Sequence, residues 1–195
     1  ELAEKYALPV VEYRNRFVAM PRRHPMFAGS NPNPFVEAAD AILVMDSATP
    51  WLPSQVSPSE NCKVLHLAPD PHYSYLPLRG FRSDIALACD SALGLQALNS
   101  AMEEPAKTNE TTIASRRKTV TALHEELEES WAKKLQDVKD QTPIHPAWIS
   151  DCISKISDAD TIFAKESQLQ VQYLDTSKPT KILNAGASSG LGHGM

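Results

Sequence analysis

The sequence has few cysteines, few glycines and no long apolar run. Its three cysteines, Cys62, Cys89 and Cys152, lie far apart and form no Cys-x-x-Cys or Cys/His cluster, so they predict neither a disulfide framework nor a zinc site. No apolar stretch approaches the roughly 20 residues that a membrane-spanning helix needs, and no signal-peptide pattern occurs at the start. Sparse cysteines are typical of a reducing compartment, and we expect a cytoplasmic protein with no membrane partner.

The sequence also lacks a dense stripe of lysine and arginine. Its 195 residues include 19 basic and 24 acidic side chains, which gives a net charge of −5. Nucleic-acid binding calls for a basic patch or stripe, so we expect no nucleic-acid partner. The hydrophobic fraction of 42% and the charged fraction of 22% are ordinary for a globular protein, which excludes wholesale disorder and a coiled-coil rod.

Three apolar runs are typical of strands in a parallel sheet. Residues 41–45, 63–67 and 85–89 are rich in Val, Ile, Leu and Ala, as expected of strands that are buried on both faces. A fourth, β-rich run covers residues 9–13. Alternating with these runs, helices are expected at residues 1–8, 35–39 and 91–102, the last of them capped by Asp90. This alternation predicts an α/β fold with a Rossmann-like parallel sheet flanked by helices.

The composition changes after Glu103. Residues 104–112 are polar and are expected to form a linker. Apolar residues between Ile113 and Val138 then recur at helical spacing, which predicts one long amphipathic helix packed on a domain rather than a membrane or partner-binding helix. On this helix we expect the side chains of Leu123, Leu127 and Trp131 to be buried. We expect those of Glu126, Glu129 and Lys133 to be exposed.

A second α/β segment follows the long helix. It should contain a helix at residues 145–156, with Pro146 in its first turn, and strands at 160–164 and 181–185. The last strand runs into a turn that contains Gly186, Gly190 and Gly192. Glycines let the backbone turn tightly, and the helix N-terminus expected behind them offers free N–H groups to a diphosphate. The alternative is a turn whose glycines serve close packing alone.

One functional interpretation of this turn is a nicotinamide site. Residues 185–192 resemble the nucleotide-binding turn of short-chain dehydrogenases. In that family, however, the turn follows the first strand and a Tyr-x-x-x-Lys motif comes later, whereas here two α/β blocks precede the turn and that motif is absent. An NAD(P)-dependent oxidoreductase that uses Gly186–Gly192 is therefore the alternative function, and a non-catalytic oligomerisation domain is a third.

Motifs along nearly the whole chain resemble thiamine-diphosphate-dependent enzymes of the acetolactate synthase and benzoylformate decarboxylase type. Six groups of residues follow the order and spacing of motifs in that family. They are Leu2-Ala-Glu, Pro9-Val-Val, His24-Pro with Gly29, residues 37–45 with Pro50-Trp51, residues 64–67 with Asp70-Pro71, and residues 84–90. The resemblance implies a central domain lacking its first strand at 1–104, a connecting segment with the long helix at 105–139, and the start of the diphosphate-binding domain at 140–195.

The resemblance also implies an activity and a set of cofactor contacts. The parent protein would be a lyase or transferase acting on 2-keto acids, with thiamine diphosphate and Mg²⁺ as cofactors and a homodimeric or homotetrameric assembly. By this match the cofactor-binding residues are Glu166, Ser188, Ser189, Gly190, Leu191, Gly192 and His193. A backbone carbonyl near Ser189 would accept a bond from the aminopyrimidine amino group, and Leu191 would hold the cofactor bent.

Each of these site residues has a structural alternative. Glu166 can be a solvated carboxylate at a strand end, Leu191 a core residue, and His193 an ordinary helix residue. The family's Gly-Asp-Gly then Asn cassette for Mg²⁺ and its N-terminal glutamate are expected outside these 195 residues. We therefore expect a piece of a longer enzyme that has no catalytic residue or metal ligand of its own and is inactive alone. Without a Gly-x-Gly-x-x-Gly turn in the central domain, no FAD is assigned.

Overall fold

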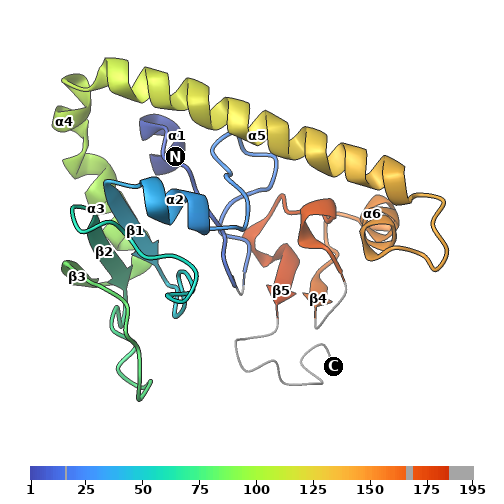
Figure 1. Ribbon diagram of the computed structural model, residues 1–195, viewed down its shortest axis with the longest axis horizontal. Helices are drawn as coiled ribbons and strands as arrows, with labels where there is room; N and C mark the ends of the chain where they lie inside the picture. Colours follow the sequence, from blue (N-terminus) through green and yellow to red (C-terminus); the bar gives the residue numbers. More distant parts are fainter. Residues whose placement is uncertain (16, 166–168, 185–195) are drawn as a thin grey trace.

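The computed structural model describes residues 1–15, 17–165 and 169–184 of the chain. Helices alternate with strands, and one long helix runs along the side of the other elements (Figure 1). The elements are α1 (Leu2–Tyr6), α2 (Asn33–Ala38), β1 (Ala41–Met45), β2 (Lys63–Ala68), β3 (Ile85–Ala88), α3 (Ser91–Ala101), α4 (Glu103–Lys107), α5 (Glu110–Val138), α6 (Pro146–Ile156), β4 (Phe163–Lys165), the 3-10 helices η1 (Val171–Tyr173) and η2 (Pro179–Lys181), and β5 (Ile182–Asn184).

Strands β1, β2 and β3 form a parallel sheet in that order. Ala41 is the register partner of Lys63, and Leu65 is the partner of Ile85. The three apolar runs of the sequence coincide with these strands to within one residue at either end. The prediction of an α/β fold with a parallel sheet flanked by helices is therefore confirmed.

Helices α2 and α3 cover opposite faces of this sheet. Val64 of β2 is fully buried in a cluster with Val36 of α2. On the other side, Gly94 of α3 lies so close to β2 that an added Cβ atom would stand 2.8 Å from Leu67 Cδ1. Successive side chains of a strand point to alternate faces, so Val64 and Leu67 face opposite ways. The sheet thus has a helix on each side.

The β3 edge of the sheet is open to solvent, in contrast to the prediction of burial on both faces. All four β3 residues are exposed, with Ile85 at 49% and Leu87 at 41%. Helix α3 buries none of its own residues, although Asp90 caps it as expected by accepting the N–H groups of Ala92 and Leu93. The core of this part lies instead among β1, β2 and α2, where the buried residues are Val36, Val44, Trp51, Cys62 and Val64.

Helix α5 packs on α1 and on the loop before α2. Val120 lies in a buried cluster with Met26, and His124 Nδ1 donates a hydrogen bond of 3.0 Å to the carbonyl oxygen of Phe27. The prediction of which face is buried was partly wrong. Leu123, Leu127 and Trp131 are only half-buried, whereas the buried residues are Val120, His124 and Val138. The buried face of α5 includes His124, which is polar and therefore does not appear in the apolar pattern. Glu126, Glu129 and Lys133 are exposed as predicted.

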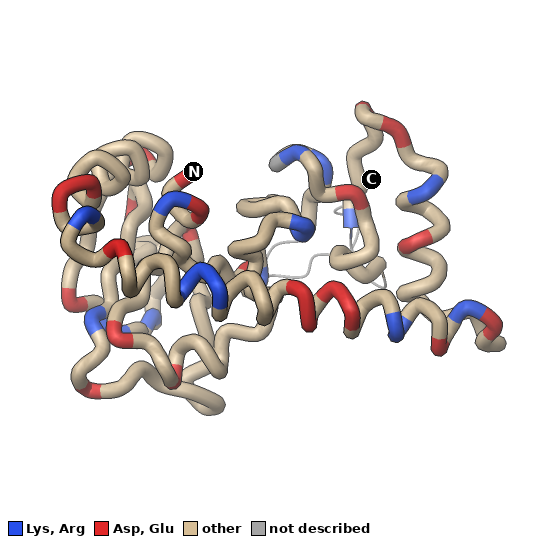
Figure 2. The backbone as a smooth tube through the Cα atoms, turned by 90° about the horizontal axis from the view of Figure 1, so that it is seen from above, with Lys and Arg blue, Asp and Glu red and all other residues tan. Residues whose placement is uncertain are grey.

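Blocks of charge alternate in sign along α5 (Figure 2). Basic residues gather at 116–118 and 133–134, with acidic residues at 125–129 between them. Such alternation is typical of a solvated helix face. In the described part of the chain, no helix is both long enough and apolar enough to cross a membrane.

Two local predictions are corrected. The expected linker at 104–112 is mostly helical, because it contains most of α4 and the start of α5. The expected strand at 9–13 is reduced to one parallel bridge between Val10 and Phe27. Its extended backbone ends at Arg14, whose φ of 52° is left-handed.

The second α/β segment contains α6, β4 and β5. The two strands pair in parallel, and α6 begins at Pro146 as expected. Strand β4 starts later than predicted, because Asp158 accepts bonds from the Asp160 N–H and the Thr161 hydroxyl and so forms a turn before it. The segment's buried residues form one cluster of Val18, Phe163, Leu174 and Ile182 and another of Val138, Ala147 and Tyr173.

Candidate functional site

All the predicted cofactor-binding residues lie outside the described residues. They are Glu166, Ser188, Ser189, Gly190, Leu191, Gly192 and His193. The structure does describe the strands that precede them in the sequence. Lys165 ends β4, Asn184 ends β5, and the two are register partners. The carboxyl ends of β4 and β5 thus form one edge, and this edge is where open parallel α/β sheets bind their ligands.

Lys165 places a positive charge at this edge. The side chain is half-buried and makes no hydrogen bond or ion pair with any described residue. Burial lowers the pKa of Lys165 from its ordinary value of 10.5, and the nearby charge of Arg22 lowers it further. A partly desolvated ammonium group of this kind favours an anionic neighbour, such as a phosphate or a carboxylate.

A buried ion pair of Arg22 and Glu12 lies near Lys165. Arg22 Nη1 contacts Glu12 Oε2, and the two residues are 4% and 3% exposed. Burial lowers the pKa of Arg22 and raises that of Glu12, because each charged form loses its hydration, while the charge of the partner opposes both shifts. Removing either partner would leave the other as an uncompensated buried charge.

The Glu12 carboxylate also shapes the loop that follows it. Oε1 accepts the N–H groups of Ala19 and Met20 at 2.5 and 2.8 Å, and Oε2 accepts the side-chain amide of Asn15 at 3.1 Å. Three donors from one loop therefore converge on a single buried carboxylate. Their convergence fixes the path of the chain between residues 12 and 20.

This loop is tied to the second α/β segment by two hydrogen bonds. The Asn184 side chain donates to the carbonyl oxygen of Asn15 at 2.9 Å, and the Arg22 N–H donates to Thr176 Oγ1 at 2.9 Å. The start of β5 is held separately by buried Lys181, whose Nζ lies 2.5 Å from the Asp158 carbonyl oxygen and 3.1 Å from Asp175 Oδ2. The strand that leads into the predicted turn is thereby anchored at both ends.

Arg79 occupies the carboxyl end of the first sheet, and the sequence did not indicate this role. Its guanidinium donates to the carbonyl oxygens of Ala48, Ser47 and Pro71 at 3.1, 3.1 and 3.3 Å, and Nη2 lies 3.3 Å from His66 Nδ1. Burial lowers its pKa. Because these bonds go to the protein itself, Arg79 acts as a clamp on the loops after β1 and β2. Backbone carbonyl partners leave no trace in a sequence motif.

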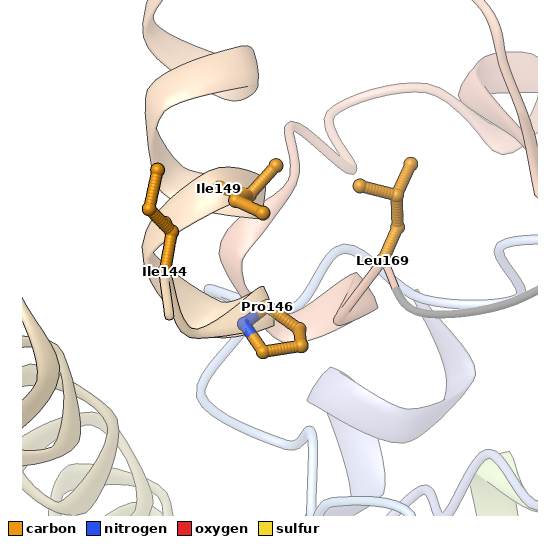
Figure 3. A pocket seen from close by; sticks show the side chains of 4 residues that line it. All are labelled: Ile144, Pro146, Ile149 and Leu169. Carbon is orange, nitrogen blue, oxygen red and sulfur yellow. The ribbon is translucent and has the colours of Figure 1, made fainter. Parts of the chain in front are cut away.

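A shallow apolar hollow lies beside α6 (Figure 3). Its volume is about 250 Å³, and Ile144, Pro146, Ile149 and Leu169 line it. No ionisable side chain takes part in this lining, so the hollow offers apolar contact and no acid–base or nucleophilic chemistry.

The described residues contain no group of three or more His, Cys, Asp or Glu side chains that could hold a metal ion. The three cysteines are free thiols, and burial raises the pKa of Cys62. A buried thiol with a raised pKa is a poor nucleophile, so Cys62 is a packing residue of the first core.

No protein-family model matches the chain, and no curated protein matches it. The class of protein is therefore given by the fold. The described residues form an α/β structure with two parallel sheets, and the long helix α5 comes between these sheets in the sequence. The observations that bear on function are therefore the sequence motifs and the residues around the carboxyl ends of β4 and β5.

Proposed function

We propose that this chain is part of a thiamine-diphosphate-dependent enzyme that decarboxylates or carboligates 2-keto acids. In this proposal residues 1–104 belong to the central domain, 105–139 form the connection, and 140–195 begin the diphosphate-binding domain. The whole enzyme is a cytoplasmic homodimer or homotetramer that uses Mg²⁺ to hold the diphosphate. Hard oxygen ligands for that ion would come from residues other than those of this chain.

The parallel pairing of β4 with β5 is the observation that best supports the proposal. Lys165 and Asn184 stand opposite each other at the carboxyl ends, and in the sequence Glu166 and the turn starting at Gly186 follow them closely. A strand followed by a glycine-rich turn is the pattern with which α/β proteins bind a diphosphate. The charge of Lys165 fits an anionic cofactor at this edge.

Each residue of the turn has a distinct task in this proposal. Thiamine diphosphate, when bound, supplies the nucleophilic carbon that attacks the keto group of the substrate. A backbone carbonyl near Ser189 accepts a bond from the aminopyrimidine, and Leu191 packs against the rings to hold them bent. Gly190 and Gly192 let the backbone approach closely. The hydrogen bond from Asn184 to Asn15 holds the end of β5 in place for them.

Titration calorimetry on the full-length protein tests the proposal. Thiamine diphosphate should bind with a strong dependence on Mg²⁺, and NADH and NADPH should give no binding heat. Tight nicotinamide binding together with no response to thiamine diphosphate would overturn the proposal and support the oxidoreductase instead. Absence of both responses would support a non-catalytic assembly domain.

The variant Leu191→Gly tests the role of the turn itself. Turnover of a 2-keto acid should fall by about tenfold or more, while thiamine diphosphate affinity changes less, because the diphosphate is held mainly through Mg²⁺. Leu78→Gly is the matched control, since Leu78 is 92% exposed in a loop. Equal losses of turnover in the two variants would contradict a specific role for Leu191.

A further inference from the structure

A second, smaller pocket lies between α5, the loop before α2 and η1, and it has a volume of about 170 Å³. Its lining comes from three distant parts of the sequence, including Arg22 and Ser30 from the loop, Leu127 and Trp131 from α5, and Gln172 from η1. None of these residues belongs to the proposed thiamine diphosphate site. The pocket is therefore separate from that site.

Arg22 brings a buried cation with unused donors to this pocket. Its side chain is 5% exposed. Both of its polar side-chain contacts, the ion pair with Glu12 and a hydrogen bond of 3.4 Å to the Met20 carbonyl oxygen, use Nη1. Nε and Nη2 have no hydrogen bond to a described residue. Neither atom is among the buried unpaired side-chain atoms of the described residues, so both keep some access to solvent. Free guanidinium donors match the two oxygens of a carboxylate.

The charges around Arg22 also favour an anion. Arg22 and Lys165 each contribute one positive charge; burial lowers the pKa of Lys165, and the charge of Arg22 lowers it further. Among the described residues, Glu12 contributes the negative charge in contact with Arg22. Of these three groups only Arg22 lines the pocket, and its free guanidinium donors would bind a carboxylate there.

The remaining walls are apolar and limit the size of a ligand. The rings of Phe27 and Trp131 lie 6.3 Å apart at 53°, and Leu127 adds an aliphatic side chain. The guanidinium of Arg22 lies 5.0 Å from the centre of the Phe27 ring. A volume of 170 Å³ is well below the roughly 300 Å³ at which pockets for drug-sized ligands begin. Only a few non-hydrogen atoms fit.

We propose that this pocket binds a small monocarboxylate with a short apolar tail, its carboxylate on Arg22 and its tail against Trp131 and Leu127. Ser30 and Gln172 form the polar mouth of the pocket. For so few atoms the dissociation constant should be about 1 mM.

Calorimetry with butyrate and butyramide tests the charge requirement. The titration uses the full-length protein without thiamine diphosphate, and the two pocket variants described below distinguish binding in this pocket from binding elsewhere, a catalytic site included. Butyrate should bind, and its uncharged amide should bind at least about tenfold more weakly, because a guanidinium bond to a charged acceptor is the stronger one. Equal binding of the two compounds, or no butyrate heat at about 20 mM, would overturn the proposal.

Two variants locate the site. Arg22→Lys keeps a charge for Glu12 but removes the fork, and Ser30→Phe fills the pocket from an exposed position. Each should weaken butyrate binding by about tenfold or more. Ser115→Phe, the same exposed change elsewhere on the molecule, should leave binding unchanged. If both pocket variants fold and bind butyrate within about twofold of the unchanged protein, the assignment to this pocket is wrong.

Discussion

Asn184 donates a hydrogen bond of 2.9 Å from its side chain to the carbonyl oxygen of Asn15, 169 residues earlier in the chain. Asn15 in turn donates to the Glu12 carboxylate, which forms the buried ion pair with Arg22. Asn184, at the end of β5, is therefore connected through its own side chain and that of Asn15 to a buried charge pair. A substitution at any of these residues should change the stability of the contact between the two α/β segments.

Asn184→Ala should lower the free energy of unfolding by about 1 kcal/mol, which is the usual net contribution of one such hydrogen bond. Urea unfolding followed by circular dichroism measures this change. Asn61→Ala is the control, because Asn61 is exposed and should cost less than about 0.5 kcal/mol. Equal unfolding curves for the two variants would show that the bond to Asn15 adds nothing to stability.

Arg79→Met should lower the free energy of unfolding by about 2 kcal/mol, because it leaves three backbone carbonyls without the charged donor that binds them. The methionine keeps much of the aliphatic contact, so the loss reports mainly on the hydrogen bonds. Arg116→Met, on the exposed side of α5, is the matched control. Equal denaturation midpoints for the two variants would contradict the role of Arg79 as a clamp on these loops.

The strands of the first sheet could be predicted because each is a short, mainly apolar segment between turn or loop residues. Burial was harder to predict. The run at 85–89 is as free of polar residues as the run at 41–45, yet β3 lies at the sheet edge and all four of its residues are exposed. Sequence composition does not encode which strands lie at an edge or which edge is covered: β1 is also an edge strand, but its Val44 lies in the buried cluster with Val36 of α2.

The contacts around the candidate site were beyond sequence reasoning for a different reason. Arg79 binds backbone carbonyls, and the Arg22 N–H binds Thr176 across 154 residues. Such pairings depend on tertiary proximity and have no local spacing to detect. The glycine-rich segment after β5 could be picked out from the sequence because glycines between a strand and an expected helix have a local physical cause. A turn at Gly186–Gly192 stays a prediction, since these residues lie outside the described ones.

The buried stripe of α5 gives a third prediction. Val120→Asp should cost about 3 kcal/mol or more, because it places an unpaired carboxylate in the cluster with Met26. Leu127→Asp should cost less, since Leu127 is only half-buried. Ala122→Asp, at an exposed position of the same helix, should cost less than about 0.5 kcal/mol. If thermal melts show a larger loss of stability for Leu127→Asp than for Val120→Asp, the buried face would instead be the one predicted from the sequence, with Leu123, Leu127 and Trp131.

The last prediction concerns acid and the join between β2 and β3. Asp84 Oδ2 accepts the N–H of Val64 at 2.8 Å, and Oδ1 lies 3.1 Å from Arg82 Nη2. The Val64 N–H first, and then Arg82, hold the pKa of Asp84 below its ordinary value of 3.8. The folded state therefore prefers the carboxylate form.

The sign of the pH effect follows from this lowered pKa. The stabilisation from Asp84 is fully present above pH 3.8, its unfolded pKa, and is lost as the pH falls through the lower pKa of the folded state. Asp84→Asn should thus melt below the unchanged protein at neutral pH, and the gap should close as the pH falls below 3.8. Calorimetric melts across this range measure the gap, with exposed Asp140→Asn as the control. A gap that stays constant down to the lowest pH would mean that the charge of Asp84 does not stabilise the fold.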